Sequence, residues 1–330
     1  MMASAPIAAA IGADVGGTYA RLGWASLRPG EPLQVRGFRT YACAEHSSLA
    51  AILRDYLDML EQDSAVPPIT RATVAIAGML DGDHLLNTNL AWPVSLARTR
   101  SDVGMEALEI INDFAAVAQA IAHVDPANRH RLSTTDGADA DAKGAPALVL
   151  GPGTGLGVAL RLENGDPPVL ASEAGHAALA PGNALELEVL RLLMQRHGHV
   201  DSERILSGPG LMALHSCLCE LRGDAIRWHS PAELVQAAQG HDPQALESIR
   251  LFCGWLGSVA GDLALTFGAR SVHLTGGITG HVAPWLHEGD FIRRFLAKGA
   301  LSPALHRVPV WRVDHGQLGV LGALAWRDFT

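Results

Sequence analysis

Lysine is nearly absent from this sequence, and its scarcity excludes two common designs of phosphate-transfer enzyme. Only Lys143 and Lys298 occur among the 25 basic residues, and each is followed by glycine. A Walker-type phosphate loop needs lysine followed by serine or threonine. The protein-kinase fold needs a lysine at the end of a Val-Ala-Ile-Lys strand. Any phosphate site in this chain must therefore be built from other groups.

Cysteine, positive charge and long apolar runs are also scarce. The spacing of Cys43, Cys217, Cys219 and Cys253 fits neither a disulfide framework nor a four-cysteine zinc site, so we expect reduced thiols in a cytoplasmic protein. The formal net charge of −9 disfavours nucleic acid as a partner. No apolar run approaches the ~20 residues that span a bilayer, and residues 1–12 lack the basic start of a signal peptide. We expect no membrane association.

What remains is a globular composition, with 48% hydrophobic and 18% charged residues in 330. This length suggests two lobes, each with its own core. Apolar alternation and helical spacing interleave along the chain, which predicts an α/β fold. Ser47 is the expected N-cap of the first helix, Asp242 that of the longest, and residues 133–146 form an expected loop. The expected strands are 7–13, 19–26, 33–41, 72–77, 108–111, 147–150, 158–162, 271–275 and 308–313, and the expected helices 49–60, 114–123, 185–197, 209–221, 243–267 and 319–326.

Two glycine-rich turns, Asp14-Val-Gly-Gly-Thr18 and Gly151-Pro-Gly-Thr-Gly-Leu-Gly157, lie in opposite halves of the chain. Each follows an apolar run and precedes an alternating one, which suggests one duplicated lobe. Successive glycine N–H groups can form a nest for an anion, and a carboxylate beside such a turn suits Mg²⁺ held with phosphates. The alternative is that both are ordinary hairpin turns and that Asp14 is only a turn former. Neither turn fits the Gly-x-Gly-x-x-Gly pattern of dinucleotide-binding folds.

Three further acidic groups are candidates for chemistry. Asn112-Asp113 lies where an expected strand ends and a helix begins, so Asp113 is either a helix cap or a general base for a substrate hydroxyl. Glu173 and His176 are three apart beside a glycine; they are either part of a surface loop or two ligands of a metal whose further ligands are not evident. Residues 201–204 are most simply a solvated charged turn.

The order of six motifs carries a specific resemblance. They are Asp14-Val-Gly-Gly-Thr18, Ile111-Asn-Asp-Phe114, Gly151-Pro-Gly-Thr-Gly-Leu-Gly157, Glu173-Ala-Gly-His176, Ser202-Glu-Arg-Ile-Leu-Ser-Gly-Pro-Gly210 and Gly276-Gly-Ile278. In this order the chain resembles the bacterial ATP-dependent glucokinase family of the actin-like sugar-kinase superfamily. The resemblance runs from about Ile11 to the last expected helix. One departure is Tyr19, where the family commonly has asparagine.

The resemblance implies a fold and a reaction. The fold would be two α/β lobes of the ribonuclease H-like, actin-like ATPase type with a cleft between them. Residues 1–123 plus 313–330 would form the smaller lobe with the first phosphate turn, and 124–312 the larger lobe with the second turn and most sugar ligands. The reaction would be transfer of the γ-phosphate of ATP to the 6-hydroxyl of glucose, with ATP and Mg²⁺ bound.

The resemblance also implies roles for individual residues. Asp113 matches the catalytic aspartate, and Asp14 would hold Mg²⁺ with the ATP phosphates, directly or through water. The sugar would be bound by Asn89, Asn112, Asp113, Glu173, His176 and Glu203. The nucleotide would be bound by Asp14, Gly16, Gly17, Thr18, Gly153, Thr154, Gly155, Ser207, Gly208, Gly276 and Gly277.

Three other functions stay open at this level. The first is a kinase for another hexose, such as fructose, mannose or an N-acetylhexosamine. The second is a non-catalytic sugar-sensing protein on the same fold, which would be expected to lose the base or the phosphate turns. The third is an ATPase or filament protein of the same superfamily. Such a protein binds no sugar, so the polar side chains of Glu173, His176 and Glu203 would have no ligand to bind. A homodimer is expected from the resemblance alone.

Overall fold

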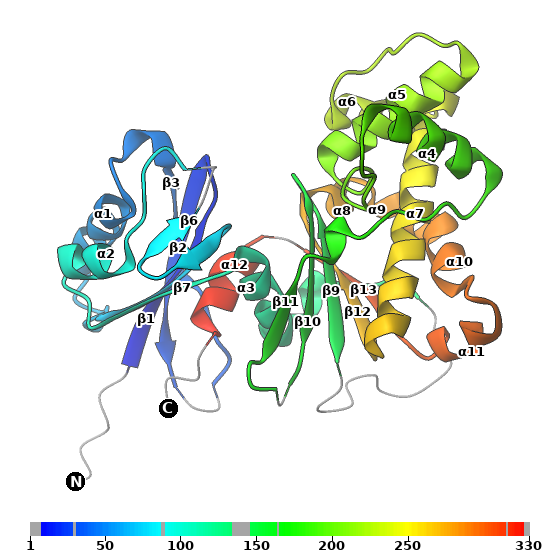
Figure 1. Ribbon diagram of the computed structural model, residues 1–330. Helices are drawn as coiled ribbons and strands as arrows, with labels where there is room; N and C mark the ends of the chain where they lie inside the picture. The colour runs from blue at the N-terminus through cyan, green and yellow to red at the C-terminus, as the bar shows by residue number, and fades with distance from the viewer. Residues whose placement is uncertain are drawn as a thin grey trace. The chain divides into compact units, whose positions relative to one another are not determined.

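The computed structural model describes residues 8–28, 31–86, 90–133, 146–163, 165–314 and 316–326. The chain divides into two compact units (Figure 1). Unit 1 comprises Met1–Val124 and Gly316–Thr330, and unit 2 comprises Asp125–His315. In the described part of the chain, no helix combines the length and apolar character that a membrane crossing requires. All four cysteines are free and buried, as expected for reduced thiols.

Unit 1 is built on a five-stranded sheet in the order β3-β2-β1-β4-β7. Its strands are β1 (Ala8–Val15), β2 (Tyr19–Leu27), β3 (Arg36–Ala42), β4 (Arg71–Ile76) and β7 (Ala107–Ile111). The first three are antiparallel neighbours, whereas β1, β4 and β7 run parallel. The carboxyl ends of the three parallel strands therefore meet at one edge of the sheet, where ligands bind in open α/β folds.

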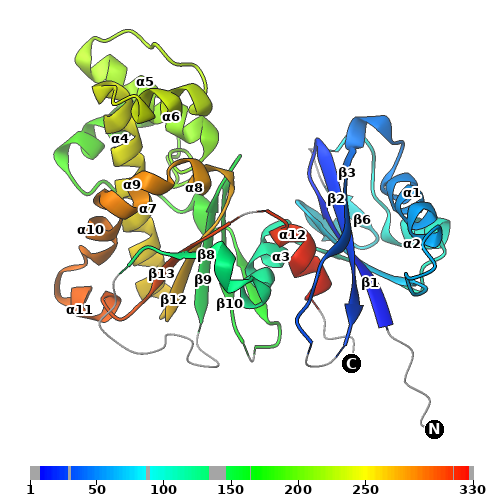
Figure 2. The same cartoon turned by 180° about the vertical axis from the view of Figure 1, so that it is seen from behind.

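Helices cover both faces of this sheet (Figures 1 and 2). On one face lie α1 (Leu49–Glu61) and α2 (Leu96–Val103), and on the other α3 (Asp113–Ala120) and α12 (Leu318–Leu324). Successive side chains of β1 point to opposite faces of the sheet. Ile11 packs in the core beneath α1, whereas Ala10 packs against α12. Asp14 therefore points toward the α12 side. A small hairpin of β5 (Met79–Asp81) and β6 (His84–Leu86) completes the unit.

Unit 2 repeats this plan with one strand added. Its sheet runs β11-β10-β9-β12-β13-β8. The strands are β8 (Arg129–Arg131), β9 (Ala147–Pro152), β10 (Leu156–Arg161), β11 (Val169–Ser172), β12 (Ser271–Leu274) and β13 (Val310–Val313). β9, β10 and β11 are antiparallel neighbours and β9, β12 and β13 are parallel, as in unit 1. The duplication suggested by the two glycine turns is thus present in the strand order.

Most of the helical structure lies in unit 2, between β11 and β13. The 25-residue helix α7 (Pro243–Phe267) is capped by Asp242, as the sequence predicted, and buries Phe252 and Trp255 in the main core of the unit. The other helices are α4 (Ala184–Arg196), α5 (Gly208–Arg222), α6 (Pro231–Gln239), α8 (Gly277–His281), α9 (Ala283–Glu288), α10 (Asp290–Leu296) and α11 (Ser302–Leu305). Short 3₁₀ turns occur at Cys43–Glu45, Ile121–His123, Pro126–Asn128, Ala174–His176 and Gly299–Leu301.

Two details differ from the sequence-based expectation. The helix cap before Leu49 is Ser48, whose hydroxyl accepts the Ala51 amide, and not Ser47. The helix expected over 114–123 ends at Ala120 and closes with a 3₁₀ turn, because the last turn of a helix often tightens. Most of the loop expected over 133–146 lies outside the described residues.

Candidate active site

In unit 1 the predicted residues gather at the carboxyl edge of the parallel strands. Asp14 of β1 lies beside Ala75 of β4, and Ala75 lies beside Ile111 of β7. Asn112 and Asp113 follow Ile111 at the start of α3. The sheet register therefore brings Asp14 and Asp113, 99 positions apart by number, to the same edge, and the charge of Asp113 acts on the carboxyl of Asp14.

The first glycine turn joins β1 to β2 as a tight connection. The Gly16 amide donates to the Tyr19 carbonyl at 2.9 Å, and the Cys43 amide donates to the Thr18 carbonyl at 2.9 Å. The Cys43 thiol, itself buried, donates to the Gly16 carbonyl at 3.3 Å. Gly16, Gly17 and Thr18 remain exposed. Cys43 thus holds the turn through two hydrogen bonds on its buried side, and the exposed side of the turn is accessible to a ligand.

Asp14 is a carboxyl group under opposing influences. Its side chain is 25% exposed, and its Oδ2 lies 3.6 Å from Nη1 of Arg21, the residue opposite it on β2. Burial raises the pKa of Asp14; the Arg21 charge lowers it, and the nearby Asp113 charge raises it again. A carboxylate in this setting gains from a cation beside it.

Asp113 is free of the capping role that the sequence left open. The N-cap of α3 is Asn112, whose side-chain oxygen accepts the Ala115 amide at 2.9 Å, so the capping interpretation of Asp113 is wrong. Oδ1 of Asp113 accepts the Phe114 amide at 2.8 Å. Burial raises the pKa of Asp113 above its usual value, and the Phe114 hydrogen bond opposes this rise. A half-buried carboxyl with a raised pKa is typical of a general base.

In unit 2 the second glycine turn is the point where three predicted segments meet. The Gly208 amide donates to the Gly153 carbonyl at 2.8 Å, which ties the start of α5 to the turn. Ser207 is the N-cap of α5, and its hydroxyl accepts the Gly210 amide at 3.0 Å. Gly276 approaches from the end of β12 with φ +91, and a Cβ there would lie 2.5 Å from the Pro152 carbonyl oxygen. Only glycine fits that position.

Around this turn, Gly277 and Thr154 are exposed, and Gly155 is half-buried. Gly277 starts α8, and a Cβ there would meet open space. The residues predicted to bind the nucleotide from three separate segments of unit 2 therefore lie close together.

Glu203 connects the second turn to the predicted sugar ligands. Its Oε2 accepts the Leu156 amide at 2.7 Å, directly after the turn. Its own amide donates to the Gly175 carbonyl at 2.9 Å, within the Glu173–His176 motif. One oxygen of the carboxylate is thus committed to the turn, and the other is available to a ligand.

His176 pairs with Asp201, an acid that is not among the predicted site residues. Its Nδ1 lies 3.2 Å from Oδ2 of Asp201, and its Nε2 lies 3.8 Å from Oε2 of Glu173. The hydrogen bond to Asp201 raises the pKa of His176. Burial tends to raise the pKa of Asp201, but the bonds from His176 and the Arg204 amide outweigh it and lower that pKa.

The solvated turn expected over 201–204 is therefore wrong for its first half, since Asp201 and Ser202 are buried. The only signal for Asp201 was its place two residues before Glu203, and that does not show where the side chain points. The described residues hold no cluster of three or more histidine, cysteine, aspartate or glutamate side chains that could bind a metal. Glu173 and His176 are accordingly not the core of such a cluster.

These groups face a cavity of about 410 Å³ within unit 2. It is lined by Thr154 of the second turn, His176, Asp201, Glu203 and Ser207, together with His197, Arg204, Pro209, Gly210 and Ala213. Asn89, the remaining predicted sugar ligand, lies outside the described residues. The cavity joins the predicted sugar-binding and nucleotide-binding residues of this unit in one space.

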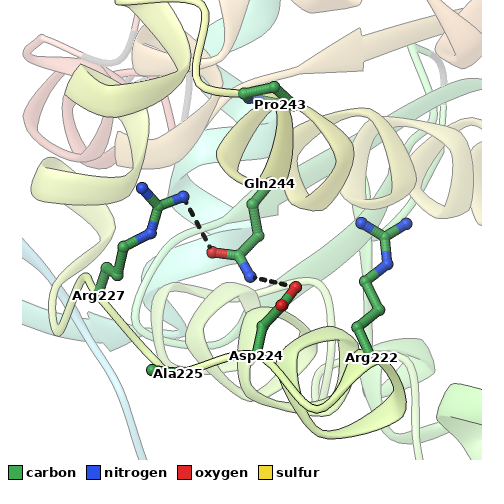
Figure 3. Close-up of a pocket in the computed structure, with 6 residues that line it drawn as sticks. All are labelled: Arg222, Asp224, Ala225, Arg227, Pro243 and Gln244. Atoms are coloured by element: carbon green, nitrogen blue, oxygen red, sulfur yellow. Dashed lines mark hydrogen bonds between the residues drawn. The ribbon is translucent and has the colours of Figure 1, made fainter.

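A second cavity of unit 2, about 370 Å³, contains none of the predicted residues. Figure 3 shows that its polar groups satisfy one another: Arg227 donates to Gln244, and Gln244 donates to Asp224. Arg227 also pairs with Asp242, and Arg222 with Glu247. Its charges are mutually compensated, so it does not compete as a candidate active site.

A family model described as Glucokinase matches residues 11–328, nearly the whole chain. The chain belongs to the glucokinase family. The glucokinase of Stenotrophomonas maltophilia (strain K279a) is 38% identical over 321 residues, covering 95% of this chain and 93% of that one. A glucokinase-like protein of Xylella fastidiosa (strain Temecula1) is 38% identical over 322 residues, covering 96% and 93%. The family resemblance seen in the six motifs is confirmed, and the chain is a sugar kinase by this membership.

Solved structures agree with the fold. A glucokinase from an Antarctic psychrotroph superposes with a TM-score of 0.85 at 32% identity, covering 96% of this chain and 98% of that one. The glucokinase of Balamuthia mandrillaris in complex with glucose has a TM-score of 0.76 at 19% identity, covering 98% and 95%. A ROK-family glucokinase of Streptomyces griseus in complex with glucose and AMPPNP has a TM-score of 0.62 at 21% identity, covering 96% and 98%. The expected α/β class is confirmed.

Proposed function

We propose that this protein transfers the γ-phosphate of ATP to the 6-hydroxyl of glucose, with Asp113 as the general base. The observation that carries the proposal is Asp113 itself. In a chain of the glucokinase family, a half-buried carboxyl with a raised pKa follows the β7 strand at the sheet edge that holds Asp14 and the first glycine turn. The Balamuthia and Streptomyces structures, which contain glucose, support a sugar site on this fold.

The remaining site residues are proposed from their chemistry. Glucose offers only hydroxyl groups and a ring oxygen, so its site needs carboxylates, amides and imidazole. Asn112, Glu173, His176 and Glu203 supply those groups, and Asn89 is proposed with them from its motif. An unpaired buried polar group costs about 1–3 kcal/mol, which is how such a site rejects a sugar with a displaced hydroxyl.

The proton and the phosphoryl group move in opposite directions in the proposed reaction. The 6-hydroxyl oxygen forms a bond to the γ-phosphorus while the bond from that phosphorus to the β-phosphate oxygen breaks, releasing ADP. The hydroxyl proton passes to the Asp113 carboxylate. Because the transition state of phosphoryl transfer is loose, Asp113 acts mainly by aligning the hydroxyl and receiving its proton late.

The phosphates of ATP are proposed to be bound by two sets of turn residues, namely Gly16, Gly17 and Thr18 of unit 1 and Gly153, Thr154 and Gly155 of unit 2. Ser207, Gly208, Gly276 and Gly277 are proposed beside the nucleotide because they adjoin the second turn. The AMPPNP in the Streptomyces structure supports a nucleotide site in this fold. We accordingly propose that the two units are the two lobes of an actin-like kinase.

Mg²⁺ fits the residues near the first turn. It prefers oxygen ligands and usually binds through one or two carboxylates plus substrate phosphates. Asp14 offers such a carboxylate at the partly exposed edge of the sheet, beside the first glycine turn. When bound, Mg²⁺ would neutralise phosphate charge; Asp14 would orient it directly or through water.

The test is turnover with a panel of sugars and phosphoryl donors in a coupled assay for ADP release. We expect glucose with ATP to give the highest kcat/KM. Faster turnover of fructose, mannose or an N-acetylhexosamine would replace glucose in the proposal. Calorimetric binding of glucose without ADP formation would identify a sugar sensor instead.

We also propose that the protein is a homodimer and that it is located in the cytoplasm, where ATP is available. Analytical sedimentation tests the first proposal, and cell fractionation tests the second.

A further inference from the structure

Asp201 is buried, charged and aimed at a predicted sugar ligand, yet nothing in the proposed reaction uses it. Its side chain is 11% exposed, whereas that of His176 is 54% exposed. An ionised carboxyl in such a place needs hydrogen-bond donors for both of its oxygens. Oδ1 accepts the Arg204 amide at 2.8 Å, and Oδ2 lies 3.2 Å from Nδ1 of His176. The first bond shapes the local turn, but the second extends to the imidazole ring.

Hydrogen bonds hold the backbone around His176 as well as the Nδ1 side of its ring. The Nε2 atom of His199 lies 2.9 Å from the His176 carbonyl oxygen, and the His176 amide donates to the Glu173 carbonyl at 2.9 Å. The Glu203 amide donates to the Gly175 carbonyl, one residue earlier. The ring is thus held at Nδ1, and its backbone is held on both sides. Nε2 lies 3.8 Å from Oε2 of Glu173, beyond hydrogen-bond distance, so it is the nitrogen that a ligand in the cavity can reach.

A carboxylate can only accept hydrogen bonds. The nitrogen that faces it must therefore carry the proton, so neutral His176 has its hydrogen on Nδ1 and a lone pair on Nε2. That lone pair can accept a hydrogen bond from a sugar hydroxyl. In the other tautomer, Nε2 would be a donor and would demand an acceptor from the sugar instead. The acid behind the ring thus selects which kind of partner the ring offers.

We propose that Asp201 is a positioning residue that fixes the orientation and the Nδ1–H tautomer of His176, so that Nε2 accepts a hydroxyl hydrogen bond from the sugar. The inference rests on the proposed function in taking the ligand to be a sugar; the pairing of Asp201 with His176 does not. Asp201 touches no reacting atom and acts only through His176.

The acidic groups that face His176 come from two segments, and all of them raise its pKa. Glu173 on its own segment and Asp201 and Glu203 on the other all favour the protonated ring, with Asp201 the strongest because of its hydrogen bond. The nearby Arg204 and the two histidines of the cavity region, His197 and His199, are the other titratable or basic groups there. Removing the Asp201 charge alone should therefore lower the pKa of His176 while Glu173 and Glu203 still act.

The decisive variant is Asp201→Asn. Asparagine keeps an oxygen for the Arg204 amide but presents an NH₂ group to Nδ1 of His176, which forces Nδ1 to accept and moves the ring proton to Nε2. Long-range ¹H–¹⁵N NMR spectra of the imidazole nitrogens report this directly, without any substrate. We expect Nδ1–H in the wild-type protein and Nε2–H in Asp201→Asn, with a lower pKa of His176 in the variant.

The kinetic readout separates positioning from catalysis. Loss of one well-placed hydrogen bond should raise the glucose KM of Asp201→Asn about 10-fold while kcat changes little. The pH profile of kcat/KM for glucose should also move to lower pH, following the His176 pKa. Asp201→Glu, which restores the acceptor, should recover part of the glucose KM. The matched control is Asp224→Asn, the same chemical change beside the second cavity (Figure 3), which should alter neither the spectrum nor the glucose KM.

Each failure has its own meaning. A wild-type spectrum with Nε2–H, which needs no variant to fold, overturns the inference even if glucose is phosphorylated. An unchanged tautomer in Asp201→Asn does the same. A changed tautomer with an unchanged glucose KM overturns the sugar-recognition part. Absence of glucose phosphorylation by the wild-type protein would instead overturn the proposed function, and the wild-type spectrum would still decide the pairing of Asp201 with His176.

Discussion

The carboxyl group of Asp14 packs directly against Gly319, the second residue of the last helix, α12. A Cβ on Gly319 would lie 2.5 Å from Cγ of Asp14 and 2.8 Å from its Oδ2. No residue with a side chain fits at this distance. Glycine at position 319 therefore allows α12 to pack closely against β1 at Asp14. The last helix of the chain thereby helps to set the position of an acid near its beginning.

Gly319→Ala tests this contact. The added methyl group must displace either Asp14 or α12, and we expect kcat to fall at least about 10-fold, with the misplacement of a site group as the cause. Gly280→Ala is the control, because a Cβ there meets open space in a helix; it should leave kcat unchanged. Steady-state kinetics at saturating ATP and Mg²⁺ with thermal unfolding distinguish a displaced acid from a lost fold. Wild-type kcat in Gly319→Ala would show that the close approach of Gly319 is not needed to position Asp14.

Asp113→Asn should lower kcat by about 10²–10⁴-fold, the usual contribution of a general base. Calorimetric glucose binding should be retained, because the amide still offers polar contacts to a hydroxyl. Asp58→Asn, on the exposed side of α1, is a matched change that should have no effect. Asp113 would be excluded as the base if its variant turned over at close to the wild-type rate.

The raised pKa of Asp113 also predicts a pH dependence. The ionised form accepts the proton, so kcat/KM should fall as pH decreases through the Asp113 pKa, at a higher pH than for an exposed aspartate. For stability the sign is reversed: a raised pKa in the folded state stabilises the protein at low pH, and this contribution is lost as pH rises through that pKa. Asp113→Asn should therefore not lower the Tm at neutral pH. A lower Tm would show that the Asp113 charge stabilises the fold.

Glu203→Ala should weaken two subsites at once. It removes a predicted sugar ligand and leaves the Leu156 amide, which now donates to Oε2 at 2.7 Å, without its acceptor. An unsatisfied amide costs about 1–3 kcal/mol, so the second turn should shift. We expect the KM for both glucose and ATP to rise, whereas Glu173→Ala, at an 87% exposed side chain, should affect glucose alone. A rise in the glucose KM only would mean that the turn does not depend on Glu203.

A buried ion pair joins α4 to α10 in unit 2. Glu186 is fully buried and Arg294 nearly so; Nη2 of Arg294 lies 3.0 Å from Oε2 of Glu186. Glu186→Ala leaves a buried guanidinium without its partner and should cost about 3–5 kcal/mol. Glu188→Ala, which breaks an exposed pair with Arg191 on the same helix, should cost about 0–1 kcal/mol. Urea unfolding measures both, and equal losses would refute the distinction.

Local sequence patterns predicted the elements that carry strong local signals. The two strand–turn–strand hairpins followed from apolar runs around glycine, and α7 followed from Asp242 and a long helical spacing. The helices α2 and α6 were missed for different reasons. α2 buries only Thr99 and has little apolar periodicity to detect. α6 has a start signal, Ser230 followed three residues later by Glu233, and a capping signal of this kind predicts where a helix begins but not that the segment is buried.

The sequence by itself determined the chemistry available at the site: which acids, amides, imidazole and glycines exist, and their order along the chain. Motif order is a one-dimensional property, and it was enough to identify the family. The tertiary structure decided which groups face one another. The parallel register of β1, β4 and β7 brings Asp14 to the edge that Asp113 follows, and the packing of residues 199–204 on 174–179 turns Asp201 inward to His176. Such contacts depend on side-chain direction and burial across many intervening residues, and no local pattern encodes them.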